Sequence, residues 1–333
     1  MSDHLRDHPD ESDALAPEVP AHAAGSAGRV AGDLDDLFDT ARRRVQGAEK
    51  PLATPWNSVN KSLGDGLWPG MYCLIRGHRR RKTQWAVQMA VHAASAGSRV
   101  LYLALELSRR ELAARIVGNV AGVPWSDLLY GRLGEAGVEK AIAQSEQQVR
   151  VLPLHVECAT PYGYGADTLD RRARELRPAL VVLDYLQLCG GRAGEEPRLS
   201  VGRVSYVARA LARDLNAVVL VLSSTARANY EALVSNPARD ATDFVGLGKE
   251  SGEIEYAADG VLVLARHAKP DVRVLVVASA PPRRAQGRRG HALDGGGVPG
   301  LRCHEGPMLI SSFMLRARRR RALQGPGPAG GHR

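Results

Sequence analysis

The sequence has few aromatic residues, few cysteines and no apolar run long enough to cross a membrane. Aromatic side chains make up 5% of its 333 residues, so a folded core must be mainly aliphatic. The four cysteines lie far apart and form no Cys-x-x-Cys pair, which indicates neither a zinc site nor a disulfide framework. The amino-terminal residues are acidic and polar, unlike a secretory signal. These features predict a cytoplasmic protein that does not enter a membrane.

Most of the chain also has equal numbers of basic and acidic residues. The formal net charge is +9, and from residue 281 onward there are eleven arginines against one Asp and one Glu. This last segment therefore accounts for the whole excess, and residues 1–280 carry no net formal charge. The basic composition is a property of the tail and gives no evidence that the rest of the chain binds nucleic acid.

Apolar segments of strand length alternate with segments of helical periodicity in the middle of the chain. The strand-length runs are, in chain order, 71–75, 99–105, 179–183, 217–222, 260–265 and 272–278, and a further strand is expected around 154–156. Strands that alternate with helices favour an α/β fold with a mainly parallel central sheet and helices on both faces. The last two runs lie close enough in sequence to form a hairpin.

The composition divides the chain into four parts. Residues 1–33 are rich in Ala, Asp, His, Pro and Gly without a sustained period, which predicts a disordered segment. Residues 34–50 carry apolar side chains at helical spacing and predict a linker helix. The main domain is expected at 51–280, and the Arg-, Gly- and Pro-rich residues 281–333 predict a disordered tail. The apolar face of the linker helix must be buried, either on its own domain or on a neighbouring subunit.

The segment 70–83 has the order of a phosphate-binding loop: a short apolar strand, a basic loop, Lys82-Thr83 and then a helix. The start of a helix presents free backbone N–H groups and a positive dipole end, which favour an anion. Lys82 would add charge for the β- and γ-phosphates, and Thr83 would add a hydroxyl for Mg²⁺. The expected nucleotide-binding residues are Gly77, Arg81, Lys82, Thr83 and Gln84.

The loop departs from the pattern G-x-x-x-x-G-K-[ST] at both glycine positions, which hold Arg76 and Arg81. Glycine is favoured there because the backbone must approach phosphate closely with unusual dihedral angles, and Arg supplies neither freedom nor room. A basic surface turn is therefore the alternative interpretation of this segment.

Two carboxylates follow strands of the same expected sheet. Glu106 follows the run 99–105, and Asp184 follows the run 179–183. In open α/β sheets ligands bind beyond the carboxyl ends of the strands, so these residues are candidates for chemistry. Asp184 would hold Mg²⁺ together with Thr83, and Glu106 would polarise the attacking water in phosphoryl transfer. A turn aspartate and a solvated helix-entry glutamate are the structural alternatives.

Three motifs in this order resemble those of the DnaB-type replicative helicase motor domain. They are Leu-Glu-Leu-Ser at 105–108, Leu-Asp-Tyr-Leu-Gln-Leu at 183–188 and Lys-Glu-Ser-Gly-Glu-Ile-Glu at 249–255. The likeness covers about residues 51–280. It implies a RecA-like P-loop NTPase fold, ATP and Mg²⁺ as cofactors, and hydrolysis coupled to movement on single-stranded DNA. It also implies a homo-oligomer, a hexameric ring.

The resemblance assigns roles to individual residues. Lys82 and Thr83 are expected to bind nucleotide, Glu106 to be the catalytic carboxylate and Asp184 to be the acid beside the metal. The residues expected to couple nucleotide to DNA, or to contact DNA, are Gln187, Arg227, Lys249 and Glu250.

The chain departs from the family pattern at three further places. Ser224 stands where the family usually has Gln, and the last apolar run leads into Ala280-Pro281-Pro282 where the family continues with a Lys-x-Arg pair that reaches a neighbour's nucleotide. About 50 residues precede the motor segment, so we expect no counterpart of the family's amino-terminal domain. The helix at 34–45 occupies the place of the family's linker helix.

A shift of reading frame is a hypothesis that accounts for the irregular loop and tail. The codons for Thr-Gly-Ala in a GC-rich gene, read one nucleotide out of step, give CAC, CGG and CGC. These encode His-Arg-Arg, the residues at 78–80. The composition of the tail is what another shift would produce, and sequencing the locus tests both.

The departures leave two alternatives to an ATP-dependent DNA helicase. One is a RecA-like accessory ATPase that works in regulation or recombination without unwinding DNA. The other is a non-catalytic remnant whose loop holds no phosphate and whose basic tail binds nucleic acid by charge.

Overall fold

The computed structural model describes residues 30–76, 82–191, 196–224, 254, 257–266, 273–278 and 308–312. The chain divides into two units between Lys50 and Pro51. In the first unit the described part is one helix, α1 (Val30–Val45), and the turn after it. The second unit contains a sheet with helices and carries all the other described elements.

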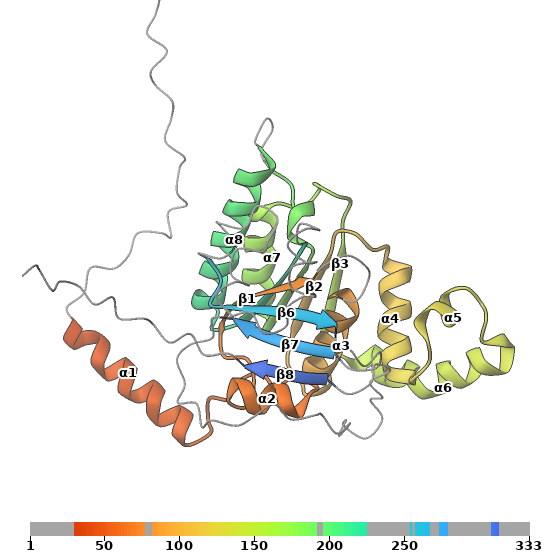
Figure 1. The fold of residues 1–333 in the computed structure, drawn as a ribbon, viewed down its shortest axis with the longest axis horizontal. Coiled ribbons are helices and arrows are strands. Elements are labelled where there is room, and N and C mark those ends of the chain that lie inside the picture. The colour runs from red at the N-terminus through yellow and green to blue at the C-terminus, as the bar shows by residue number, and fades with distance from the viewer. Residues whose placement is uncertain are drawn as a thin grey trace, which may run out of the picture. The chain divides into compact units, whose positions relative to one another are not determined.

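The described strands form one eight-stranded sheet in the order β3-β2-β4-β5-β1-β6-β7-β8. Figure 1 shows β6, β7 and β8 side by side at one end of this sheet. Their bounds are β1 Gly70–Arg76, β2 Val100–Ala104, β3 Leu154–Cys158, β4 Leu180–Asp184, β5 Val218–Ser224, β6 Gly260–Arg266, β7 Arg273–Ala278 and β8 Met308–Ser312. The six strands from β3 to β6 pair in parallel, β7 pairs antiparallel to β6, and β8 pairs parallel to β7. The predicted mainly parallel sheet is confirmed, and β6 and β7 form the antiparallel pair expected of the predicted hairpin.

Helices cover both faces of this sheet. The helices of the second unit are α2 Asn57–Leu63, α3 Lys82–Ser95, α4 Arg109–Ala121, α5 Trp125–Leu129, α6 Gly134–Val151, α7 Ala166–Leu176 and α8 Pro197–Asp214. Side chains of α2, α3 and α4 form one buried cluster with one face of the sheet. Side chains of α7 and α8 form a second cluster with the other face.

Strand β1 shows why the strands appear in the sequence as continuous apolar runs. Met71, Cys73 and Ile75 belong to the α7–α8 side of the core, whereas Tyr72 and Leu74 belong to the α3–α4 side. Successive side chains of a strand point to opposite faces, and here both faces are covered by helices. No position in the strand is therefore left for a solvated polar residue.

The ends of α4 follow the local signals in the sequence. The Ser108 side chain accepts from the backbone N–H of Glu111, and the Glu111 carboxylate accepts from the backbone N–H of Ser108 at 3.0 Å. This is a capping box, which satisfies two N–H groups that have no partner inside the helix. At the other end Gly122 has φ 68°, a left-handed conformation that favours glycine.

The structure differs from the sequence-based boundaries at both ends of the chain. Helix α1 begins at Val30, inside the segment for which disorder is predicted. Strand β8 lies inside the tail, where Met308-Leu309-Ile310 forms a short apolar run among Arg, Gly and Pro. Composition averaged over a long segment hides a run this short, whereas pairing with β7 depends only on these few residues.

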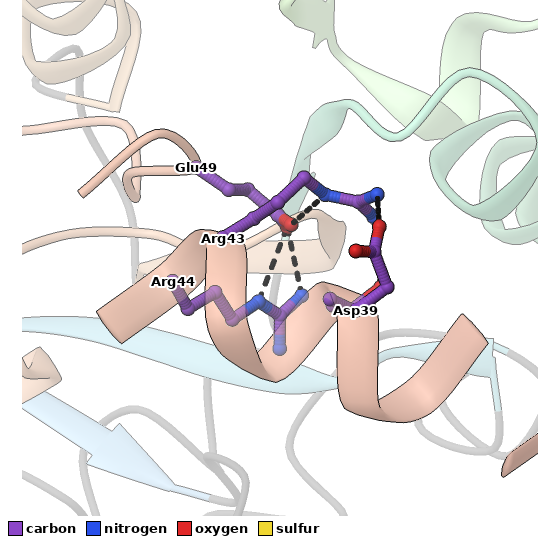
Figure 2. Close-up of polar contacts among 5 residues, drawn as sticks. Asp39, Arg43, Arg44 and Glu49 are labelled. Carbon is purple, nitrogen blue, oxygen red and sulfur yellow. Dashed lines mark hydrogen bonds and ion pairs between the residues drawn. The ribbon is translucent and has the colours of Figure 1, made fainter. Parts of the chain in front are cut away.

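Helix α1 is joined to the turn after it by a group of polar contacts (Figure 2). The guanidinium of Arg44 donates to Glu49 Oε1 from Nε at 3.2 Å and from Nη2 at 2.9 Å. Arg43 forms an ion pair with Asp39 and donates to Thr40 Oγ1 at 2.9 Å. Both arginines lie in the last turn of the helix, where positive charge complements the helix dipole.

None of the helices in the part of the chain that the structure describes is both long enough and apolar enough to cross a membrane.

Candidate nucleotide-binding site

Lys82 is the first residue of α3 and lies at the carboxyl edge of the sheet. Its Nζ donates to the backbone oxygen of Ser223, near the end of β5, at 2.6 Å. The same Nζ lies 5.6 Å from the centre of the Tyr185 ring, just after β4. The ammonium group is therefore held above the ends of two central strands, where ligands of α/β sheets bind.

Asp184 is the last residue of β4 and is 2% exposed. Its carboxylate accepts from the Tyr102 hydroxyl at 2.9 Å and from the side chain of Thr83. Burial, with a smaller contribution from the charge of nearby Glu106, raises the pKa of Asp184 to about 6. The hydrogen bonds from Thr83 and Tyr102 and the charge of Lys82 act on the pKa in the opposite direction, because they stabilise the ionised form.

Glu106 follows β2 and is exposed at the same edge. Strands β2 and β4 are parallel neighbours, with Ala104 opposite Asp184, and the backbone N–H of Leu105 donates to the Asp184 carbonyl at 2.7 Å. The register thus brings Glu106 next to Asp184, close enough for its charge to affect the Asp184 pKa. The four residues from three separate segments, Lys82, Thr83, Glu106 and Asp184, lie at one edge of the sheet.

The oxygen atoms at this edge suit a magnesium ion. Mg²⁺ is typically bound by one or two side-chain oxygens, several waters and the phosphates of its substrate. Thr83 and Asp184 supply a hydroxyl and a carboxylate that are already in hydrogen-bond contact. Within the described residues, no three His, Cys, Asp or Glu side chains converge to make a site built wholly of protein ligands.

Gln187 is connected to the same strand end as Lys82. It lies in the 3₁₀ turn Leu186–Leu188 that follows β4. Its Nε2 donates to Ser223 Oγ at 2.7 Å, and its Oε1 accepts from the backbone N–H of Ser224 at 3.3 Å. Ser223 also accepts from Lys82. Gln187, the candidate coupling residue, and Lys82, the candidate phosphate-binding residue, therefore both contact Ser223.

The structure adds two residues that the sequence did not single out, Tyr102 and Ser223. Tyr102 is the one hydroxyl-bearing side chain in the strand segment 100–104, and it is fully buried. Ser223 is a fully buried polar residue that follows five apolar residues in β5. A polar side chain within or directly after an apolar strand-length run is the signal that would have marked both, because such a group needs a partner when it is buried.

Several predicted site residues fall outside this arrangement. Gly77, Arg81, Arg227, Lys249 and Glu250 lie outside the described residues. Gln84 is described, and its side chain lines a separate hollow on the side of α3 that faces α4.

Trp85 connects α3 to the segment that enters the domain. Its ring stacks on that of Trp56, with centroids 4.8 Å apart and an interplanar angle of 17°. Trp56 directly precedes α2, so the helix that follows the phosphate loop packs on the segment leading into the main domain.

Strand order and chemistry together define the class of protein. A lysine at the start of the helix that follows β1, with carboxylates after the neighbouring strands β2 and β4 of a parallel sheet, is the arrangement of a RecA-like P-loop NTPase fold. The family model described as "DnaB-like helicase C terminal domain" matches residues 53–276. The chain belongs to this family, and the resemblance inferred from its motifs is confirmed.

Relatives with similar sequences are named as replicative helicases. The "Probable plasmid replicative DNA helicase" of Chlamydia muridarum is 28% identical over 249 residues, which cover 69% of this chain and 54% of the relative. The "Replicative DNA helicase DnaB" of Geobacillus stearothermophilus is 27% identical over 203 residues, covering 56% of this chain and 40% of the relative. The chain spans about half the length of the curated relatives it matches.

Solved structures show the same fold. A chain described as an ATPase domain superposes with a TM-score of 0.63 at 17% identity, covering 77% of this chain and 92% of that one. A structure of a DnaB-like replicative helicase, described with its interactions with primase, gives a TM-score of 0.62 at 16% identity. It covers 78% of this chain and 64% of the other. At these identities the likeness establishes the fold.

Proposed function

We propose that this domain binds ATP with Mg²⁺ at the carboxyl edge of the sheet and couples ATP hydrolysis to movement on single-stranded DNA, as a subunit of a homo-oligomeric helicase. The observation that carries the proposal is the convergence of Lys82, Thr83, Glu106 and Asp184 from three chain segments. Family membership supports it, since the relatives are named as replicative helicases.

Each of these side chains has a distinct role in the proposal. Lys82 neutralises the β- and γ-phosphates, and Thr83 and Asp184 hold the magnesium ion. Mg²⁺ supplies charge stabilisation for the phosphoryl group. Glu106 is exposed at the same edge, so water can reach its carboxylate, which orients that water and accepts its proton.

A change of partner at Lys82 offers a route from nucleotide to DNA. In the structure, Lys82 donates to a neutral carbonyl, that of Ser223. A phosphate oxygen is a stronger acceptor because the hydrogen bond is then between two charged groups. We expect Lys82 to leave Ser223 when ATP binds, while Gln187 keeps its side-chain contacts with Ser223 and Ser224. Arg227, Lys249 and Glu250 complete the proposal as coupling or DNA-contacting residues on the chain that follows β5.

The apolar face of α1 supports assembly with further copies of the chain. Four large apolar side chains of this helix are exposed: Leu34 at 42%, Leu37 at 58%, Phe38 at 53% and Val45 at 89%. Their spacing places them along one side of the helix. Full burial of each such side chain contributes about 1.5–3 kcal/mol. We propose that this face packs on a neighbouring subunit.

The test is ATP binding and turnover with and without single-stranded DNA. Lys82→Ala should weaken Mg·ATP binding at least tenfold, because it removes the phosphate-binding charge, whereas the control Lys61→Ala on α2 should leave it unchanged. Arg81→Gly should raise turnover if Arg hinders the approach of the loop to phosphate. Equal affinities for wild type and Lys82→Ala would contradict the proposed site.

A second function is favoured by one feature of the sequence. After β7 the chain continues with Ser279-Ala280-Pro281-Pro282 instead of a Lys-x-Arg pair. An accessory ATPase that does not unwind DNA is consistent with this. It would hydrolyse ATP without separating strands of a forked DNA duplex, and a strand-separation assay run beside the turnover assay distinguishes the two.

A further inference from the structure

The loop after β3 contacts the turn after β4, although these two strands are not neighbours in the sheet. Strand β2 lies between them. The backbone N–H of Tyr162 donates to the Leu188 carbonyl at 2.8 Å, and the N–H of Gly190 donates to the Tyr164 carbonyl at 2.9 Å. Gly165 and Gly190 also form a parallel β-bridge. The loop therefore crosses the carboxyl end of β2 to reach this turn, and we call these backbone contacts together the loop contact.

The loop contact requires glycine at position 190. A Cβ atom added to Gly190 would lie 2.1 Å from the carbonyl oxygen of Tyr162, far inside van der Waals contact. A Cβ atom added to Gly165 would lie 2.9 Å from the Gly190 carbonyl oxygen. Both obstructing atoms belong to the backbone, so they cannot rotate away as the end of a flexible side chain can. Glycine permits such a close approach of two backbones, and any side chain at position 190 must separate the loop from the turn.

The turn after β4 carries Gln187, whose side chain continues the hydrogen bonding of β5 where β4 ends. The register of β4 with β5 extends only to Leu183 and Val221. Further along β5, the N–H of Ser224 donates to Gln187 Oε1 at 3.3 Å, and Gln187 Nε2 donates to Ser223 Oγ at 2.7 Å. Gln187 thus supplies with its side chain the kind of partner that a longer β4 would supply with its backbone.

Two kinds of contact hold this turn in place. Leu186 and Cys189 are buried in the core on the α7–α8 side. From the loop, Tyr162 donates to the carbonyl of Leu188, which is one residue beyond Gln187. Consecutive Cα atoms are only about 3.8 Å apart, so a displacement at Leu188 also moves Gln187. The 3.3 Å hydrogen bond that Gln187 Oε1 accepts is already long, so a shift of about 0.5 Å would break it.

We propose that Gly190 is a positioning residue: it permits the loop contact, which holds the turn so that Gln187 stays on the end of β5. Ser223 accepts from both Gln187 and Lys82, so the loop contact acts on a residue that also contacts the proposed phosphate site. The role of Gly190 in coupling rests on the proposed function, in which Gln187 connects nucleotide to DNA. The positioning of Gln187 does not depend on that function.

The experiment measures hydrogen exchange of the Ser224 amide in the full chain without nucleotide, by mass spectrometry with single-residue resolution. Gln187→Met removes the acceptor of this N–H and should raise its exchange rate roughly tenfold or more. Gly190→Ala should do the same, because Gln187 is displaced. Gly165→Ala meets a less severe obstruction and should give a smaller rise, which keeps the test possible if Gly190→Ala does not fold.

Gly131→Ala is the matched control, in the turn after α5. Its φ of 70° strains an alanine, but among the described residues no atom would lie within 4 Å of the added Cβ. It should leave exchange at Ser224 as in wild type. The double variant Gly190→Ala/Gln187→Met should exchange at Ser224 like Gln187→Met alone, because Gly190 acts through Gln187. Faster exchange in Gly190→Ala that is confined to the loop contact overturns the proposal, and so does a further rise in the double variant.

ATP turnover with and without single-stranded DNA tests the role in coupling. Gly190→Ala should reduce the stimulation of turnover by DNA at least threefold, and should leave ATP affinity and turnover without DNA as in wild type. Equal stimulation of the two proteins overturns the coupling role of Gly190. If DNA does not stimulate the wild type, the proposed function fails and the coupling role with it, whereas the exchange rates at Ser224 still decide whether Gly190 positions Gln187.

Discussion

Two tyrosine–carboxylate pairs of the same geometry lie in different surroundings. Tyr102 donates to Asp184 at 2.9 Å, and Tyr164 donates to Glu157 at 3.0 Å. Glu157 also accepts from the Arg172 guanidinium at 2.6 Å, on the edge strand β3. Asp184 is fully buried, with burial raising its pKa to about 6, and receives only hydroxyl donors and the charge of Lys82.

The difference is the one expected if Glu157 has a structural role and Asp184 binds the proposed cation. An ion pair with Arg satisfies the charge of Glu157. The charge of Asp184 is only partly compensated, so the site would gain most from a cation placed beside it. The buried charge of Asp184 is therefore unfavourable at the place where the proposed magnesium ion binds. The charge of Glu157 is neutralised by Arg172.

The largest expected effect comes from removing the Asp184 charge. Asp184→Asn should weaken Mg²⁺-dependent ATP binding by about 100-fold, or ~2.7 kcal/mol, because a metal-binding carboxylate is replaced by a neutral amide. Glu157→Gln is the matched control and should leave that affinity unchanged. Calorimetric titration of ATP at fixed Mg²⁺ measures both, and an equal loss in the two variants would contradict the comparison.

The same substitution should stabilise the protein when nucleotide and Mg²⁺ are absent. The folded-state pKa of Asp184, about 6, lies above the ordinary value of 3.8, so its contribution to stability is fully present below pH 4 and is lost as the pH rises through 6. At pH 7.5, Asp184→Asn removes the cost of a buried charge and should add up to about 3 kcal/mol to the free energy of unfolding.

Urea unfolding in EDTA at pH 7.5 and pH 4 measures this difference. The advantage of Asp184→Asn over wild type should disappear at the lower pH, where Asp184 is protonated in the folded state. A difference that does not depend on pH would show that the buried charge is not its origin.

Substitution of Tyr102 or Tyr164 should have a smaller effect than Asp184→Asn. Tyr102→Phe and Tyr164→Phe each remove one buried hydroxyl that donates to a carboxylate, so each should lose about 1–2 kcal/mol of stability. Only Tyr102→Phe should change the Mg²⁺ concentration needed for half-maximal ATP binding, by about threefold to tenfold, a change of ~0.7–1.4 kcal/mol. Magnesium titrations of both variants decide this. Equal behaviour would mean that Tyr102 only fills the core.

The smallest effect is expected from a substitution in the ion pair between Arg172 and Glu157. Arg172 is partly exposed, with 30% of its side chain accessible, so Arg172→Gln exchanges an ion pair that water already screens. We expect its urea midpoint to stay near that of wild type and its nucleotide affinity to be unchanged. A marked loss of nucleotide affinity would show that β3 contributes to the site.

The sequence was sufficient to predict that three residues of the candidate site lie at one edge of the sheet. Lys82, Glu106 and Asp184 each follow an apolar strand-length run, and parallel strands place such positions at one edge of the sheet. The fold could be predicted for the same reason, since burial on both faces leaves strands as uninterrupted apolar runs.

The remaining contacts depend on register and on side-chain direction, which the sequence does not encode locally. Tyr102 meets Asp184 because β2 and β4 are aligned with Ala104 opposite Asp184. Gln84 faces α4 because of the rotation of α3, although its position in the phosphate-loop pattern suggested a nucleotide contact. Both depend on pairing between segments about 30 to 80 residues apart.

The stacked indoles of Trp56 and Trp85 give this protein an internal optical probe. Two of its four tryptophans are coupled at 4.8 Å, and one of them lies two residues beyond Thr83. Any displacement of α3 relative to the entry segment changes their overlap, and with it the near-ultraviolet circular dichroism of the pair. We expect any movement of α3 on nucleotide binding to be detectable in this way without a label, at a position that no substitution discussed above alters.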